Sequence, residues 1–96
     1  MAMHVTFDTT EALEVATRLG LDFGVEPFSL DEFRHGMEVE LEHGRRDPET
    51  NVTGDDPITT GKIALAHLRE MPDYYTRLAR MEAEAEAERA EAMDPA

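Results

Sequence analysis

This chain of 96 residues contains no cysteine and no tryptophan, and aromatic residues make up only 6% of it. The absence of cysteine excludes disulfide bonds, Cys-ligated zinc and thiol chemistry. No apolar run is long enough to cross a membrane, and the first residues do not form a secretory signal, so we expect a cytoplasmic protein. A chain this short forms one small domain with a modest core, which self-association would usefully extend.

Basic residues are also scarce. Nine Lys and Arg residues, of which Lys62 is the only lysine, stand against 22 Asp and Glu residues, giving a formal net charge of −13. Binding to phosphate groups needs Lys and Arg, so we expect no direct binding to nucleic acid or to an anionic membrane surface. Basic proteins and cations remain compatible partners. The acidic excess fits a salt-adapted or GC-rich source more simply than an acidic functional surface.

Start and stop signals for the first two helices are clear. Asp8 and Glu11 have the spacing of a capping box, and the short helix that follows should end at Gly20. Ser29 caps a second helix, which we expect to end at Gly44. Apolar residues recur in this second helix at intervals of three and four and predict its core-facing side. They are Leu30, Phe33, Met37 and Leu41.

A polar loop over residues 45–56 precedes the third helix. Asp56 followed by Pro57 is a typical helix start. Pro72 disfavours helical geometry at Met71, so the helix should break there and continue after a kink. Several loop side chains carry the hard oxygens that bind Ca²⁺ or Mg²⁺, but their spacing does not match an EF-hand, and a capped turn explains them as well.

These signals predict an all-α fold: a short N-terminal helix plus a long helical hairpin with a Pro-kinked C-terminal helix. Residues 1–81 form the expected single helical domain. Residues 82–96 alternate Glu and Ala, which favours an exposed, acidic helical extension that frays at its end. We expect the core to include Met37, Leu41, Ile63, Leu68 and Leu78.

Two pairs of His and Glu give the sharpest functional signal: Glu40-x-x-His43 and His67-x-x-Glu70. Residues three apart share one face of a helix, so each pair can direct an imidazole and a carboxylate to the same point. Glu-x-x-His is also the pair that carboxylate-bridged iron and manganese bundles take from two of their helices. The hypothesis is a site for Fe, Mn or Zn formed by Glu40, His43, His67 and Glu70.

A structural role for His67 is the alternative, because a histidine on an apolar helix face is more often a core residue with a satisfied hydrogen bond. His43 lies beside the loop, whereas His67 lies roughly 15 Å along the next helix. A shared site therefore requires a second subunit, a crossing helix or a folded-back loop. In the structural alternative, His67 bonds a backbone carbonyl or a loop residue such as Asn51 or Thr53.

Two further features bear on the same region. Gly36 interrupts the second helix at a cost of roughly 1 kcal/mol relative to alanine, which indicates close approach of another backbone or an ion, or a packing notch. Tyr74 and Tyr75 are expected to fill core and rim positions, with hydroxyls that reach polar partners.

Three sequence blocks resemble a family of short proteins of unknown function. Members of that family occur in bacteria, archaea and the viruses of both, alone or inside larger phage polypeptides. The resemblance covers residues 9–82 and implies a shared fold, with no established activity or site. The blocks are FRHGMEVELEHG at 33–44, TNVTGDD at 50–56 and KIALAHLREMPDYY at 62–75.

Enzyme signatures are missing: there is no Gly-rich phosphate loop, nucleophile elbow, His-Glu-x-x-His or zinc spacing. We therefore expect a small acidic helical interaction protein without enzymatic activity, acting through a protein partner or self-association. Its expected setting is that of a viral or mobile-element accessory or structural component, virion-associated if virus-encoded. The alternative function is a metal-binding protein or metalloenzyme whose Glu/His cluster is assembled by self-association.

Overall fold

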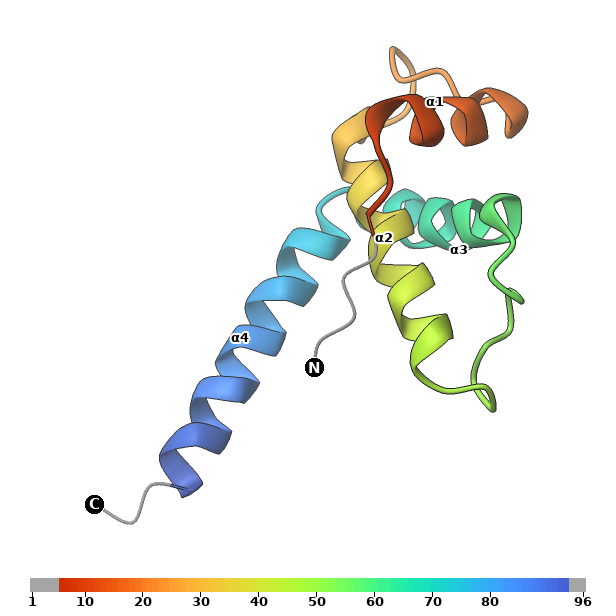
Figure 1. Ribbon diagram of the computed structural model, residues 1–96. Helices are drawn as coiled ribbons and strands as arrows, with labels where there is room; N and C mark the ends of the chain where they lie inside the picture. The colour runs from red at the N-terminus through yellow and green to blue at the C-terminus, as the bar shows by residue number, and fades with distance from the viewer. Residues whose placement is uncertain (1–5, 94–96) are drawn as a thin grey trace.

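The computed structural model describes residues 6–93, which form four helices joined by loops (Figure 1). The helices are α1 (Thr9–Arg18), α2 (Leu30–Arg46), α3 (Pro57–Glu70) and α4 (Tyr74–Met93). No strand occurs in this range, so the all-α prediction is confirmed. α2 and α3 form the predicted hairpin and pack against each other more extensively than any other pair of helices. The predicted break at Pro72 separates α3 from α4.

The helix starts follow the capping signals. Asp8 accepts a 2.7 Å hydrogen bond from the Glu11 amide, and the Glu11 carboxylate accepts one from the Asp8 amide, which completes the capping box of α1. Ser29 and Asp56 cap α2 and α3, each accepting a hydrogen bond from the amide three residues further on. These side chains satisfy amides that would otherwise lack a partner in the first turn.

α2 continues two residues past its predicted end at Gly44, as far as Arg46. Gly44 is buried, and a Cβ atom there would lie 3.1 Å from the side-chain oxygen of Asn51. That oxygen accepts hydrogen bonds from the Gly54 amide and the Thr53 hydroxyl. The glycine therefore does not stop the helix but makes room for the loop that packs against its last turn.

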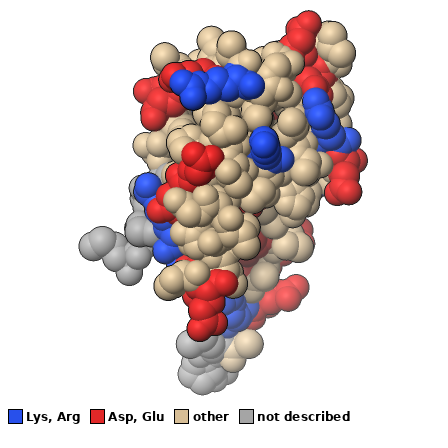
Figure 2. All heavy atoms as spheres, turned by 90° about the vertical axis from the view of Figure 1, so that its right-hand side faces the viewer, with Lys and Arg blue, Asp and Glu red and all other residues tan. Residues whose placement is uncertain are grey.

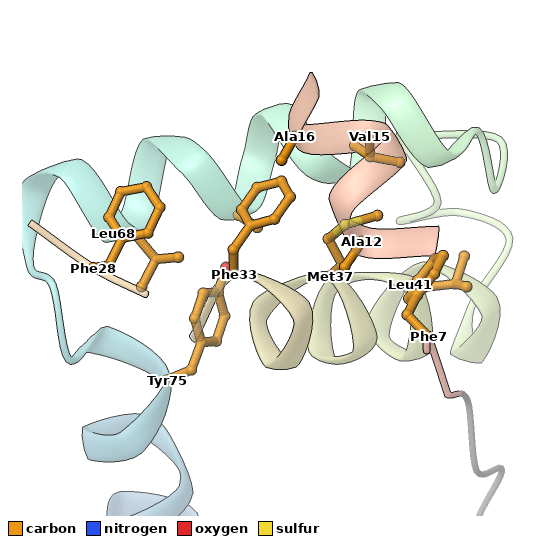
Figure 3. Packing of buried hydrophobic residues seen from close by; sticks show 11 residues of the cluster. Phe7, Ala12, Val15, Ala16, Phe28, Phe33, Met37, Leu41, Leu68 and Tyr75 are labelled. Atoms are coloured by element: carbon orange, nitrogen blue, oxygen red, sulfur yellow. The ribbon is translucent and has the colours of Figure 1, made fainter. Parts of the chain in front are cut away.

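The core lies where α1, α2 and α3 meet, and α4 contributes a single aromatic side chain to it (Figure 3). Met37, Leu41 and Leu68 are buried as predicted, whereas Ile63 and Leu78 are only partly buried. Leu78 is less covered because α4 leaves the other helices at this point. The buried apolar residues are Phe7, Ala12, Val15, Ala16, Phe28, Phe33, Met37, Leu41, Ala64, Leu68 and Tyr75.

Ion pairs and hydrogen bonds of charged side chains link segments that are distant in the sequence. Arg34 pairs with Glu38 at 2.7 Å and also donates to the carbonyl of Phe7, whose amide donates to Glu38. Arg69 pairs with Glu26 at 2.6 Å across 43 residues of sequence. On the face displayed in Figure 2, basic side chains lie among acidic and uncharged ones, without a continuous basic surface.

α4 points away from the other helices (Figure 1). We call residues 7–78 the body and the residues from Ala79 to Ala92 the exposed part of α4. Among the described side chains of α4, Tyr75 alone is buried, and every residue from Ala79 to Ala92 is exposed. Residues 94–96, where fraying was predicted, lie outside the described range. Within that range, no helix combines the length and apolar character needed to cross a membrane.

Candidate functional site

Side chains from α2, α3 and α4 converge on the carboxylate of Glu40. The Tyr75 hydroxyl donates a 2.7 Å hydrogen bond to Glu40 Oε2, and His67 Nε2 lies 3.8 Å from the same oxygen. α3 runs across α2 in the view of Figure 1, which is how His67 comes to face the middle of α2 within one chain. We call Glu40, His67, Tyr74 and Tyr75 the Glu40 cluster.

Aromatic contacts fix the imidazole of His67. Its ring stacks on Tyr74, with centroids 4.3 Å apart and planes 4° from parallel. The ring of Tyr75 stands perpendicular to both, at centroid distances of 6.1 Å from His67 and 4.9 Å from Tyr74. Stacked and edge-on aromatic pairs add to the stability that burial alone provides. The start of α4 is thereby held against both α2 and α3.

The ring of Tyr75 occupies a notch in α2 that Gly36 creates. A Cβ atom at Gly36 would lie 2.5 Å from Tyr75 Cε2, a separation that no side chain tolerates without movement. Figure 3 shows Tyr75 reaching from α4 toward α2 and Phe33. Of the alternatives open for this glycine, the packing notch is correct, and the partner is an aromatic ring.

Burial raises the pKa of Tyr75, and the hydrogen bond to the negatively charged Glu40 raises it further. Both causes disfavour the phenolate: burial removes its hydration, and the neighbouring carboxylate repels it. Tyr75 is 1% exposed and remains a neutral donor through the physiological range. Its bond to Glu40 is charge-assisted, so it is stronger than a bond between neutral groups.

The four residues of the predicted metal site do not assemble within one chain. Glu40 and His67 meet, whereas His43 is exposed in the last turns of α2 and Glu70 is exposed at the end of α3. In the described part of the chain, no group of three or more His, Asp or Glu side chains is placed to hold a metal ion. Completion of the site by self-association stays a prediction.

The loop partner that the structural alternative gave to His67 is wrong. Asn51 donates to Asp55 at 3.0 Å and accepts from Thr53 at 3.2 Å, so both loop residues bond within the loop. His67 turns instead toward Glu40 and Tyr74. The expectation that a tyrosine hydroxyl reaches a polar partner is confirmed for Tyr75. The sequence signal for these contacts is the short Met71–Asp73 linker. It is followed directly by Tyr74 and Tyr75, which pack against His67 of the preceding helix.

Two surface hollows lie away from the Glu40 cluster. One of about 250 Å³ lies between α1 and the start of α3, over Phe7, Val15 and Ile58. A shallower one lies along the outer side of α1. Neither is lined by a residue of the cluster. The cluster is a packed junction of three helices in which Tyr75 is buried and the His67 side chain is 35% exposed.

Comparison with known proteins identifies a family. Residues 12–84 match the family described as protein of unknown function (DUF5661), and the chain belongs to it. The matched range contains α2, α3 and the whole Glu40 cluster, and it ends within the exposed part of α4. None of the curated proteins or solved structures compared with the chain matches it significantly.

Proposed function

We propose that this member of a family of unknown function is an interaction protein that presents the exposed part of α4 to a protein partner. The observation that carries the proposal is the contrast within α4, where Tyr75 is buried and every residue from Ala79 to Ala92 is exposed. Most helices in proteins are stabilised by packing an apolar face rather than by propensity alone. A helix fixed at one end and uncovered along the rest is suited to docking.

The chemistry of the Glu40 cluster supports a positioning role better than a catalytic one. Tyr75 stays protonated and fills the notch at Gly36. Glu40 is mostly buried and accepts the Tyr75 hydrogen bond. The Tyr75 hydroxyl and the Glu40 carboxylate bond to each other. The cluster therefore determines where α4 starts and in which direction it leaves the body.

The setting we propose is that of an accessory or structural component of a virus or another mobile element, in the cytoplasm or in a virion. Its support is the resemblance of the three sequence blocks to proteins found in prokaryotes and their viruses. The formal charge of −13 makes a protein partner more compatible than nucleic acid or an anionic membrane.

Site-specific photo-crosslinking in the source cell tests the proposal. A photoreactive residue replaces Ala85 on the exposed part of α4 or, as the control, Thr10 on the exposed side of α1. We expect one discrete adduct from position 85 and none from position 10. The adduct partner, once purified, should bind the full chain at a fixed stoichiometry. Absence of a discrete adduct from position 85 would contradict the proposal, whatever position 10 gives.

Metal binding by self-association is the second candidate, favoured by the approach of His67 Nε2 to Glu40 Oε2 at a partly exposed point. Two copies would bring two imidazoles and two carboxylates together. Protein purified without chelator should then contain stoichiometric Fe, Mn or Zn, which is lost in His67→Ala. A site that uses all four predicted ligands should lose the metal in His43→Ala as well. Only trace metal, in a monomeric chain, would rule this candidate out.

A further inference from the structure

From Leu78 onward, α4 carries a narrow apolar side. Leu78, Met81 and Ala85 follow one another at intervals of three and four residues, so they lie on one side of the helix. Glu88 and Arg89 occupy the next turn of this side, and Ala92 lies one turn beyond them. Leu78 packs against the edge of the core, and Met81 is 58% exposed. The apolar side is therefore continuous with the core at one end and uncovered beyond it.

Two rows of glutamate border this side. Glu82 and Glu86 are four residues apart on one flank, where Arg89 follows them. Glu84, Glu88 and Glu91 follow one another at four and three on the other flank, where Arg80 precedes them. Like charges at these spacings face each other on the helix surface and repel, which destabilises the helix. A partner that supplies positive charge to both flanks would relieve this repulsion.

The glutamates of α4 are not neutralised by the rest of the described chain. Ion pairs join residues of the body and the start of α4, the last of them between Arg77 and Asp73, and none involves a glutamate from residues 82–91. Residues 82–91 contain five glutamates and one arginine, a formal charge of 1 − 5 = −4, and the longer range 78–92, which also contains Arg80, has a formal charge of 2 − 5 = −3.

We infer that α4 from Leu78 to Ala92 is a docking surface for a basic amphipathic helix of a partner protein, with an apolar stripe flanked on both sides by Lys or Arg. This inference rests on the proposed function and adds the chemistry of the partner. A second copy of this chain is a poor occupant, because it would place equal negative rows and two chains of charge −13 against each other. Charge complementarity favours a cationic helix instead.

The test uses the full chain and two labelled synthetic helical peptides that share a leucine stripe. One peptide carries lysine on both flanks of the stripe, and the other carries glutamate. Binding is measured by fluorescence anisotropy in 150 mM NaCl, a salt concentration at which unspecific attraction between exposed charges is largely screened (about 8 Å Debye length). We expect the lysine peptide to bind saturably and the glutamate peptide not to bind.

Matched variants locate the site. Glu84→Gln/Glu88→Gln removes two charges beside the stripe, and Glu49→Gln/Glu70→Gln removes two from exposed positions on the body. We expect the first pair to weaken binding about five-fold and the second to leave it within about two-fold. Met81→Ser should weaken binding about ten-fold, whereas Leu13→Ser, at a residue 48% exposed on α1, should not.

Equal weakening by the two glutamine pairs would overturn the inference, because attraction would then depend on net charge alone. Failure of the lysine peptide to bind would also overturn it, as would a discrete dimer of the chain that the peptide cannot compete away. An adduct from position 85 combined with failure of the lysine peptide rejects the basic helix while leaving the interaction role intact. Absence of adducts from position 85 rejects both.

Discussion

The body and the exposed part of α4 differ in burial and in charge. The body has a contiguous apolar core, capped helices and ion pairs that join distant segments, such as Arg69 with Glu26. From Ala79 to Ala92, by contrast, every residue is exposed, and charges of one sign predominate. The difference indicates that folding stability is concentrated in the body, whereas α4 contributes surface chemistry. The Glu40 cluster joins the two.

The largest effect should come from the core. Leu68 is fully buried between the helices, so Leu68→Ala removes apolar contacts and leaves a cavity, at an expected cost of about 2–5 kcal/mol in the free energy of unfolding. Leu13→Ala, at a position 48% exposed, is the matched control and should change it by less than about 0.5 kcal/mol. Urea unfolding followed by circular dichroism measures both. Equal midpoints for the two variants would contradict a stabilising core at the α2–α3 contact.

The next effect concerns the hydrogen bond that fixes α4. Tyr75→Phe leaves the Glu40 carboxylate without its donor and should cost about 1.5 kcal/mol at neutral pH. Tyr74→Phe keeps that bond and is the control. Circular dichroism melts give the comparison. If both variants unfold alike, the bond to Glu40 does not stabilise the junction.

The same pair of variants has a characteristic pH dependence. The pKa of Tyr75 is raised in the folded chain above its ordinary value of 10.0, so the unfolded chain releases this proton first. The resulting stability is complete below about pH 10 and declines as the pH rises further, by up to about 1.4 kcal/mol per pH unit. Above pH 10, the free energy of unfolding should fall less steeply with pH in Tyr75→Phe than in the unchanged chain. In Tyr74→Phe it should fall as in the unchanged chain.

A smaller net effect is expected at the notch. Gly36→Ala places a methyl group 2.5 Å from the ring of Tyr75, an overpacking that costs about 1–3 kcal/mol, while alanine returns roughly 1 kcal/mol of helix propensity. The net loss should be about 1 kcal/mol. In the Tyr75→Ala background the clash is gone, so Gly36→Ala should stabilise the chain instead. A cycle of the four chains by urea unfolding tests this, and additive effects would contradict the proposed contact.

Local signals predicted most of the fold because they act within a few residues. Asp8, Ser29 and Asp56 begin helices, and Pro72 ends one, through backbone geometry and hydrogen bonds between residues close in the sequence. Gly44 misled the prediction of the end of α2. This glycine makes room for the loop that packs against α2, and such a tertiary contact cannot be recognised from the neighbouring sequence.

The candidate site was predicted in part. Glu40 and His67 were both singled out, and they do meet. The predicted pairs, Glu40 with His43 and His67 with Glu70, rest on a spacing of three residues within one helix. Contact between residues of two helices depends instead on how α3 crosses α2. Tyr75 completes the site through the direction of α4 after the linker, which no helical periodicity encodes.

The smallest effect on stability should come from removing the acidic end of α4. Among the described residues 82–92, ending the chain after Met81 deletes no buried side chain and no ion pair, so the free energy of unfolding should change by less than about 0.5 kcal/mol. Loss of several glutamates also reduces self-repulsion, so the change should, if anything, be stabilising at low salt. Far-UV circular dichroism should report less helix, while the urea midpoint stays nearly constant. A destabilisation above about 1 kcal/mol would mean that the end of α4 is part of the folded body, and the division between a stable body and a presented helix would be wrong.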